Sequence, residues 1–207
     1  LAFDLVTTGI STNSDKIVQI AIIGSSSYGD EISYETLINP RRAIPLQASE
    51  VHGIYDSDVR SLNDFSKFAD EIFELIEGSV IVGHNVRQFD LPLLNNEFRR
   101  LGKLPPSPKA VMDTLEVVRR IKIPRPHNLG SLCTRHGISL ENAHTAAADA
   151  AASLLLFWRL SVDHAPYFRK SLIELERWLV HGESKNEDSM LCLLYTSDAA
   201  DERSSVD

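Results

Sequence analysis

The segment that most clearly suggests chemistry is an aspartate inside an apolar run. Asp4 lies in the strand-like segment 2–6, and Thr7, Thr8 and Gly9 follow it. A half-buried carboxylate in such a strand needs a partner, and a cation is the simplest one. The alternative interpretation is that Asp4 caps the Thr-Thr-Gly turn.

Further acidic and imidazole side chains lie at junctions between expected elements. Asp90 ends the segment VGHNVRQFD, which joins a buried strand to a helix, and it also suits a helix N-cap. His144 precedes Asp149 at the start of an alanine-rich helix. Five residues at about 100° each place these two about 140° apart on a helix, so they share no helix face. We therefore expect His144 in the turn before the helix, above a site that Asp149 enters from the first turns, although a lone histidine there is usually structural.

The elements that must position these residues follow a clear order. Three strands come first, and the short turns between them favour antiparallel pairing. A helix is expected between Asn63 as its N-cap and Gly78 beyond its last turn. The order then alternates helices with buried strands, which implies an α/β fold with a mixed sheet covered on both faces. The expected strands are 2–6, 16–24, 33–38, 79–83 and 110–112, and the later helices are 91–101, 114–120, 128–136, 145–160 and 166–181.

Composition is that of a globular domain. The chain has 207 residues, of which 43% are hydrophobic and 24% charged, and no apolar run approaches the roughly 20 residues that span a bilayer. Cys133 and Cys192 cannot build a disulfide framework, so a reducing compartment is expected. Cys133, Trp158 and Trp178 are all expected in the core because their contexts are helical.

Charge is unevenly distributed along the chain. The net charge of -8 argues against a nucleic-acid partner, yet residues 1–86 hold 13 acidic and 5 basic side chains whereas residues 87–125 hold 4 acidic and 9 basic ones. The basic stretch is either an ordinary solvated face or a phosphate-tracking patch beside the acidic site. Its members are Arg87, Arg99, Arg100, Lys103, Lys109, Arg119, Arg120, Lys122 and Arg125.

In chain order, FDLVTTG, HGI, GHNVRQFD, DTL and HTAAADA resemble the motifs of the DEDDh-type 3′–5′ exonucleases, the family of the proofreading epsilon subunit of bacterial DNA polymerase III. No single motif is specific, but the ordered set is. The resemblance implies a ribonuclease-H-like fold, with a mixed central sheet that begins with three antiparallel strands and helices on both faces.

The resemblance and the two ends together predict the domain organisation. We expect an exonuclease domain over 1–162 that lacks its natural N-terminus, because the chain starts at Leu1 inside a strand. An appended helix is expected over 163–182 and a disordered tail over 183–207. Within that tail, 192–207 resembles a translated sequencing-library adapter, and the alternative is a natural acidic tail. The appended helix is expected to pack against the domain, or alternatively to dock a polymerase or helicase.

The resemblance implies hydrolysis of 3′-terminal phosphodiesters of DNA or RNA, with release of nucleoside monophosphates. The implied cofactors are two Mg²⁺ or Mn²⁺ ions. Asp4 would bridge both ions, Asp149 would bind the nucleophile-side ion, and Asp90 would act through water. His144 would be the general base. The implied contacts to nucleic acid are Thr7, Thr8, Gly9, His52, His84 and Asn85.

The implied partner is single-stranded nucleic acid or a 3′ end, beside a DNA polymerase or a helicase. No membrane partner is implied, and a cytoplasmic location is expected, associated with the nucleoid if the source is bacterial. Two further functions stay open: a binding or scaffold module that holds nucleic acid without cutting it, and a small-molecule phosphodiesterase on the same fold.

One position departs from the family pattern. The family has Glu two residues after the first Asp, where this chain has Val6. The Glu binds the nucleophile-side metal and receives the 3′-hydroxyl, and valine can do neither. Asp4 and Val6 share a strand face, so the valine would point an apolar group at the ion. Loss of this charged ligand is expected to reduce the rate of hydrolysis roughly 10²- to 10⁴-fold. The residue reflects a sequence error, an inactivating change in an ordinary enzyme, or a nucleic-acid-binding pseudoenzyme.

Overall fold

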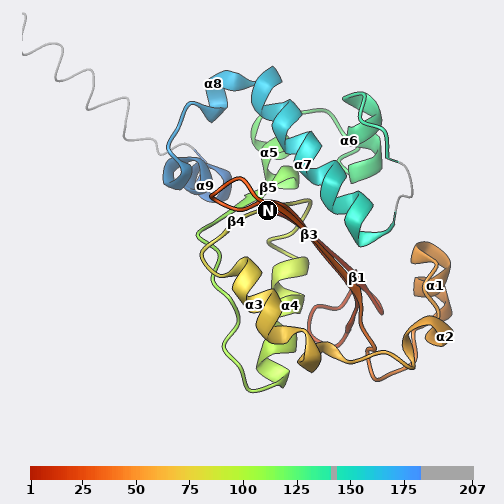
Figure 1. Cartoon of the computed structure of the whole chain (residues 1–207). Coiled ribbons are helices and arrows are strands. Elements are labelled where there is room, and N and C mark those ends of the chain that lie inside the picture. The colour runs from red at the N-terminus through yellow and green to blue at the C-terminus, as the bar shows by residue number, and fades with distance from the viewer. Residues whose placement is uncertain (141–143, 183–207) are drawn as a thin grey trace, which may run out of the picture.

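A computed structural model describes residues 1–140 and 144–182 of the chain (Figure 1). The predicted tail over 183–207, with its adapter-like segment 192–207, lies outside the described residues.

A five-stranded sheet in the order β3-β2-β1-β4-β5 forms the centre of the fold. Its first three strands pair antiparallel, whereas β4 pairs with β1, and β5 with β4, in parallel. This confirms the predicted mixed sheet with three antiparallel strands first. The strands are β1 (Ala2–Thr7), β2 (Ile17–Ser25), β3 (Glu31–Leu37), β4 (Val80–Gly83) and β5 (Ala110–Asp113).

Helices cover both faces of this sheet, as predicted (Figure 1). Phe3 and Leu5 point from β1 into one core cluster with α3 and α4, whereas Ala2 and Val6 point the other way, towards α7. Strand side chains alternate between faces, so β1 contributes to both layers. The helices are α3 (Ala69–Ile76) and α4 (Asp90–Arg100) on one face, and α5 (Thr114–Arg120), α6 (Leu129–Arg135) and α7 (Ala146–Asp163) on the other.

Two short helices between β3 and α3 were not predicted. They are α1 (Leu46–His52) and α2 (Asp56–Val59). The sequence of α1 has no apolar residues at helical spacing from which a helix could be predicted. Its Leu46 and Val51 side chains are both 61% exposed. The helix expected after Asn63 instead begins with a 3₁₀ turn, η1 (Phe65–Lys67), whose cap is Asp64 accepting from the Ser66 backbone N–H.

The final predicted helix is divided in two. α8 (Ala165–Phe168) ends before a new helix, α9 (Leu172–His181), begins. Ser171 and Glu174 form a reciprocal capping box that gives α9 its own N-terminus. α9 then buries three apolar side chains in the cluster that contains β5, α5 and α7, as the packing interpretation expects. None of the described helices has both the length and the apolar character needed to cross a membrane.

The expectation for the two tryptophans was half wrong. Trp178 is 5% exposed and Cys133 is fully buried, but Trp158 is 59% exposed on α7. Its helical context gave no information on which side of α7 it faces.

This difference predicts unequal costs of truncation. Trp178→Ala should lower the free energy of unfolding by about 3 to 5 kcal/mol because it opens a cavity in a packed cluster. Trp158→Ala should change it by less than about 1 kcal/mol because the ring is mostly in solvent. Urea unfolding of both variants measures the two losses, and similar losses would contradict the placement of the rings.

Candidate active site

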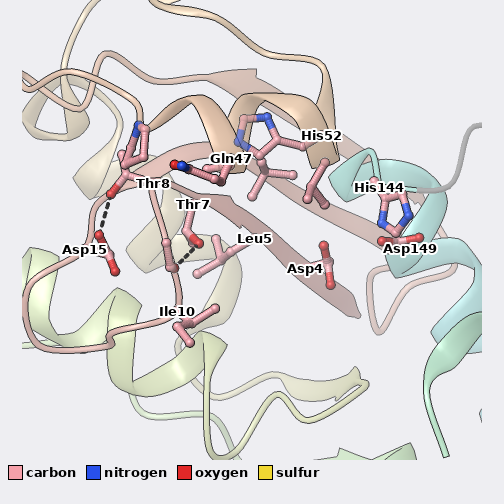
Figure 2. Close-up of a pocket in the computed structure, with 15 residues that line it drawn as sticks. Asp4, Leu5, Thr7, Thr8, Ile10, Asp15, Gln47, His52, His144 and Asp149 are labelled. Carbon is pink, nitrogen blue, oxygen red and sulfur yellow. Dashed lines mark hydrogen bonds between the residues drawn. The ribbon is translucent and has the colours of Figure 1, made fainter.

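A cavity of about 590 Å³ opens at the end of β1, bounded by α1 and the first turns of α7 (Figure 2). The cavity brings together residues that are far apart in the sequence. The predicted site residues that line it are Asp4, Thr7, Thr8, Gly9, His52, His144 and Asp149.

Asp4 lines this pocket, where it is buried close to two other carboxylates. Burial raises the pKa of Asp4 well above its usual value, and repulsion by Asp90 and Asp149 adds to the effect. Within the part of the chain that the structure describes, no hydrogen bond or ion pair reaches the Asp4 carboxylate. A carboxylate in this state favours a proton or a cation.

Asp90 lies behind the strand rather than in the pocket lining. It is the first residue of α4, is 3% exposed, and its Oδ1 accepts a hydrogen bond of 3.1 Å from the Leu5 backbone N–H. The N-cap position of α4 belongs to Phe89, so the capping interpretation of Asp90 was wrong. Burial raises the pKa of Asp90 to about 7, although the backbone hydrogen bonds that it accepts oppose this shift.

His144 lies in the turn before α7, as expected, in the left-handed conformation with φ of 75°. Figure 2 shows its ring beside the Asp149 carboxylate, which enters from the first turn of the helix. Burial raises the pKa of Asp149, and the backbone N–H and the charge of His144 act in the opposite direction. The two side chains therefore form one unit at the mouth of the pocket.

A buried amide in the sheet fixes where α7 begins. Gln19 of β2 accepts from the Ala146 backbone N–H at 3.1 Å and donates to the Glu35 carboxylate at 2.8 Å. Gln19 also lies directly opposite Val6 in the β1–β2 register. Gln19 was not predicted as a site residue, although a glutamine within the apolar segment 16–24 was a usable signal.

The loop before Asp90 is held by a carboxylate on the neighbouring strand. Asp113 is 1% exposed, and it accepts from the backbone N–H groups of Asn85 at 2.9 Å and Arg87 at 3.1 Å. The His84 ring lies 2.8 Å from the Thr114 hydroxyl. Neither His84 nor Asn85 lines the pocket. These two predicted nucleic-acid contacts therefore lie apart from the predicted contacts that do line it. The DTL motif gave a signal for Asp113, but its role required the structure.

The Thr-Thr-Gly turn is braced by a second residue that sequence reasoning missed. Asp15 accepts from the Thr8 hydroxyl at 2.9 Å (Figure 2). It also accepts from the Ser11 backbone N–H at 2.8 Å. A Cβ at Gly9 would lie 2.6 Å from an Asp15 oxygen, so any side chain there would displace the brace. The turn therefore needs both the glycine and the aspartate.

His52 lies at the rim of the pocket, at the end of α1. Its Nδ1 accepts from the Ile54 backbone N–H at 3.1 Å. Burial lowers the pKa of His52, which favours the neutral ring.

Val6 occupies the face of β1 that Asp4 also uses. It lines the pocket, is 7% exposed and belongs to an apolar cluster with Val18, Ala146 and Ala150. Across residues 1–140 and 144–182, no three His, Cys, Asp or Glu side chains are close enough together to hold a metal ion. The negative charges of Asp4 and Asp149 fit a divalent cation, but two carboxylates are a small set of ligands. A carboxylate at position 6 would add a third.

None of the basic residues over 87–125 lines the pocket. Arg87 donates to the Val111 carbonyl at 2.8 Å and contacts Glu116 and Glu176. Arg120 donates to two carbonyls at the end of α9. The structure therefore gives Arg87 and Arg120 roles within the fold, and the phosphate-tracking alternative for the stretch as a whole stays a prediction.

The model of a family described as Exonuclease (RNase_T) matches residues 1–157. The chain belongs to this exonuclease family. It is 32% identical over 168 residues to the DNA polymerase III subunit epsilon of Treponema pallidum, covering 79% of this chain and 77% of the relative. It is also 31% identical over 165 residues to the PolC-type DNA polymerase III of Halalkalibacterium halodurans. That match covers 79% of this chain but only 11% of the relative.

Solved structures agree on the fold. E. coli exonuclease I in complex with a dT13 oligonucleotide superposes with a TM-score of 0.69 at 24% identity, covering 80% of this chain and 41% of that one. Exonuclease X in complex with 5′-overhanging duplex DNA superposes with a TM-score of 0.62 at 18% identity, covering 86% and 97%. The ribonuclease-H-like α/β fold is thus confirmed.

The raised pKa of Asp90 predicts that Asp90→Asn stabilises the metal-free protein at pH 8. The pKa of Asp90 is about 7 in the folded state and 3.8 for an ordinary aspartate. Between these pH values the folded protein keeps a proton on Asp90 that the unfolded protein has lost, so its stability falls as the pH rises. Above pH 7 the charged carboxylate costs about 2 to 4 kcal/mol. The isosteric amide avoids this cost and can still accept from Leu5.

Urea unfolding in EDTA at pH 8 and pH 5 measures this effect. The advantage of the variant should shrink at pH 5. The exposed Asp70, whose ion pair with Lys103 lies on the surface, provides the control Asp70→Asn, which should show little change. A native protein more stable than Asp90→Asn at pH 8 would refute the assignment.

Proposed function

We propose that this chain is a metal-dependent 3′–5′ exonuclease domain that releases nucleoside monophosphates from DNA or RNA 3′ ends, with turnover impaired by Val6. The observation that supports it most is one pocket, in a chain of the exonuclease family, that gathers Asp4, Asp149 and His144 with the Thr-Thr-Gly turn.

Asp4 and Asp149 are the residues that would hold Mg²⁺ or Mn²⁺, with Asp90 acting through water. When bound, two such ions lower the pKa of the attacking water and stabilise the leaving oxygen. His144 is exposed at the mouth of the pocket, where its ring can accept the proton of the attacking water.

Other residues of the pocket lining would bind the nucleotide. The Thr7–Gly9 turn and His52 would contact the terminal nucleotide. The Asp15 brace keeps the turn in place through Thr8 and Ser11. His84 and Asn85 would act indirectly, by shaping the loop that leads to Asp90.

A second candidate function is a nucleic-acid-binding or scaffold module that is catalytically weak or inactive. The packing of Val6 favours it, because this side chain is integrated in an apolar cluster rather than facing an opposing charge. Both functions keep the nucleic-acid pocket and differ in whether bond cleavage follows.

The named relatives also suggest partners. Because one relative is a subunit of DNA polymerase III, a polymerase is the proposed macromolecular partner, with a helicase as the alternative. A cytoplasmic, nucleoid-associated location accompanies this proposal.

Restoring the carboxylate tests the two functions. The assay uses Mn²⁺ and a single-stranded oligonucleotide labelled at its 5′ end. Val6→Glu should raise the rate of mononucleotide release roughly 10²- to 10⁴-fold and shorten the labelled strand from its 3′ end. Val6→Gln, of similar size but uncharged, is the matched control and should stay slow.

The outcomes separate the candidates. A Val6→Glu protein that binds the oligonucleotide but releases no mononucleotide favours the binding module. Hydrolysis of small nucleotide esters without dependence on chain length favours the small-molecule phosphodiesterase. Shortening from the 5′ end contradicts the proposed polarity.

A further inference from the structure

The first turns of α7 carry Asp149, but their sequence does little to hold the helix in register. Asp149 is flanked on each side by three alanines, 146–148 and 150–152. Of these, Ala146 and Ala150 are fully buried against the sheet. Because the alanines are alike, a helix shifted by one residue would pack almost as well and would turn Asp149 by about 100°. A buried polar contact is one means of fixing such a register.

Gln19 supplies this contact from the sheet. It lies on β2, is 9% exposed, and its Oε1 accepts from the Ala146 backbone N–H at 3.1 Å. The N-cap of α7, Thr145, accepts from the Ala148 backbone N–H at 3.3 Å, but this bond lies within the helix and moves with it. The Gln19 bond instead joins α7 to an interior strand, and it satisfies one of the N–H groups that a helix leaves open at its start.

Glu35 sets the orientation of the Gln19 amide. Gln19 lies opposite Leu37 in the β2–β3 register, and Glu35 is the diagonal neighbour on the same face of β3. The Glu35 carboxylate accepts from the Gln19 Nε2 group at 2.8 Å, and a carboxylate has no proton to donate. The Gln19 nitrogen must therefore face Glu35, which leaves the carbonyl oxygen for α7. Glu35 itself is exposed at the edge of the sheet.

This contact reaches both His144 and Asp149 through the backbone. Ala146 comes two residues after His144 and three before Asp149, and the Asp149 backbone N–H donates to the Thr145 carbonyl at 3.0 Å. A helix start held at Ala146 therefore sets where the Asp149 carboxylate lies relative to Asp4. A displacement of about 1 Å in a reacting site can cost roughly 10²-fold in rate.

We propose that Gln19, oriented by Glu35, is a positioning residue that fixes the register of α7 and so holds Asp149 and His144 at the pocket. This inference rests on the proposed function. Gln19 does not line the pocket, so it acts through the backbone of α7 rather than on a bound ligand.

Two measurements test this role. Hydrogen exchange of the Ala146 amide, followed by NMR, reports the contact itself, and calorimetric titration with Mn²⁺ reports its effect on the site. Gln19→Met removes the acceptor at nearly constant volume. Asn39→Leu is the matched control, since Asn39 is also a buried amide, 8% exposed, but lies outside the pocket lining. Its Nδ2 donates to the Arg60 carbonyl at 3.0 Å.

Gln19→Met should speed exchange at Ala146 at least tenfold and weaken Mn²⁺ binding about tenfold. Asn39→Leu should lose stability to a similar extent but change neither quantity. The double variant Gln19→Glu with Glu35→Gln keeps an acceptor for the Ala146 N–H and a donor beside that acceptor. It should therefore restore native exchange at Ala146 and bind Mn²⁺ at least as tightly as the native protein.

Glu35→Ala tests the same contact even if Gln19→Met does not fold, because Glu35 is exposed. It should speed exchange at Ala146 about two- to tenfold, whereas Glu31→Ala, which removes the same charge from the same strand, should not. Native exchange at Ala146 in Gln19→Met, equal exchange in the two glutamate variants, or a loss of Mn²⁺ affinity no larger than that of Asn39→Leu would overturn the inference. A native protein that binds no Mn²⁺ would instead refute the proposed function, and exchange at Ala146 would still decide whether Gln19 holds α7.

Discussion

The buried carboxylate of Asp4, with Asp90 and Asp149 near enough to repel it, imposes the main constraint on this fold. Asp4, Asp90 and Asp149 come from a central strand and from helices on opposite faces of the sheet. Burial raises the pKa of each, and the charges of Asp90 and Asp149 repel that of Asp4. Such an arrangement is costly unless a proton or cation compensates it. Binding energy from the cation is the compensation that the proposed function supplies.

The scaffold meets this constraint with polar contacts that are themselves buried. The Leu5 backbone ties Asp90 to β1, Gln19 fixes the first turn of α7, and Asp113 shapes the loop that ends at Asp90. Each contact joins segments that are distant in sequence, so the carboxylates keep their relative positions only when the whole sheet is formed. Deleting one partner would leave a buried polar group without its hydrogen bond, which usually costs about 1 to 3 kcal/mol.

Strand and helix patterns predicted the sheet because they are local signals, whereas the proximity of Asp4 to His144 and Asp149 was implied by the family resemblance. They could not show that Trp158 faces solvent, since helical context does not identify the outward face, or that α1 forms without an apolar stripe. They left open whether the basic stretch is a solvated face or a phosphate-tracking patch, and they did not reveal that Arg87 and Arg120 bind carboxylates and carbonyls of the fold itself. Such contacts depend on tertiary neighbours that spacing alone does not specify.

Calorimetric titration with Mn²⁺ tests the proposed cation site most directly. The proposed site predicts that native protein binds Mn²⁺ through Asp4, that Asp4→Asn abolishes binding, and that Val6→Glu strengthens it roughly ten- to hundredfold. Val6→Gln should not strengthen it, because an amide adds no charge. Mn²⁺ binding that is unchanged by Asp4→Asn would contradict the central claim that the buried aspartates form the cation site.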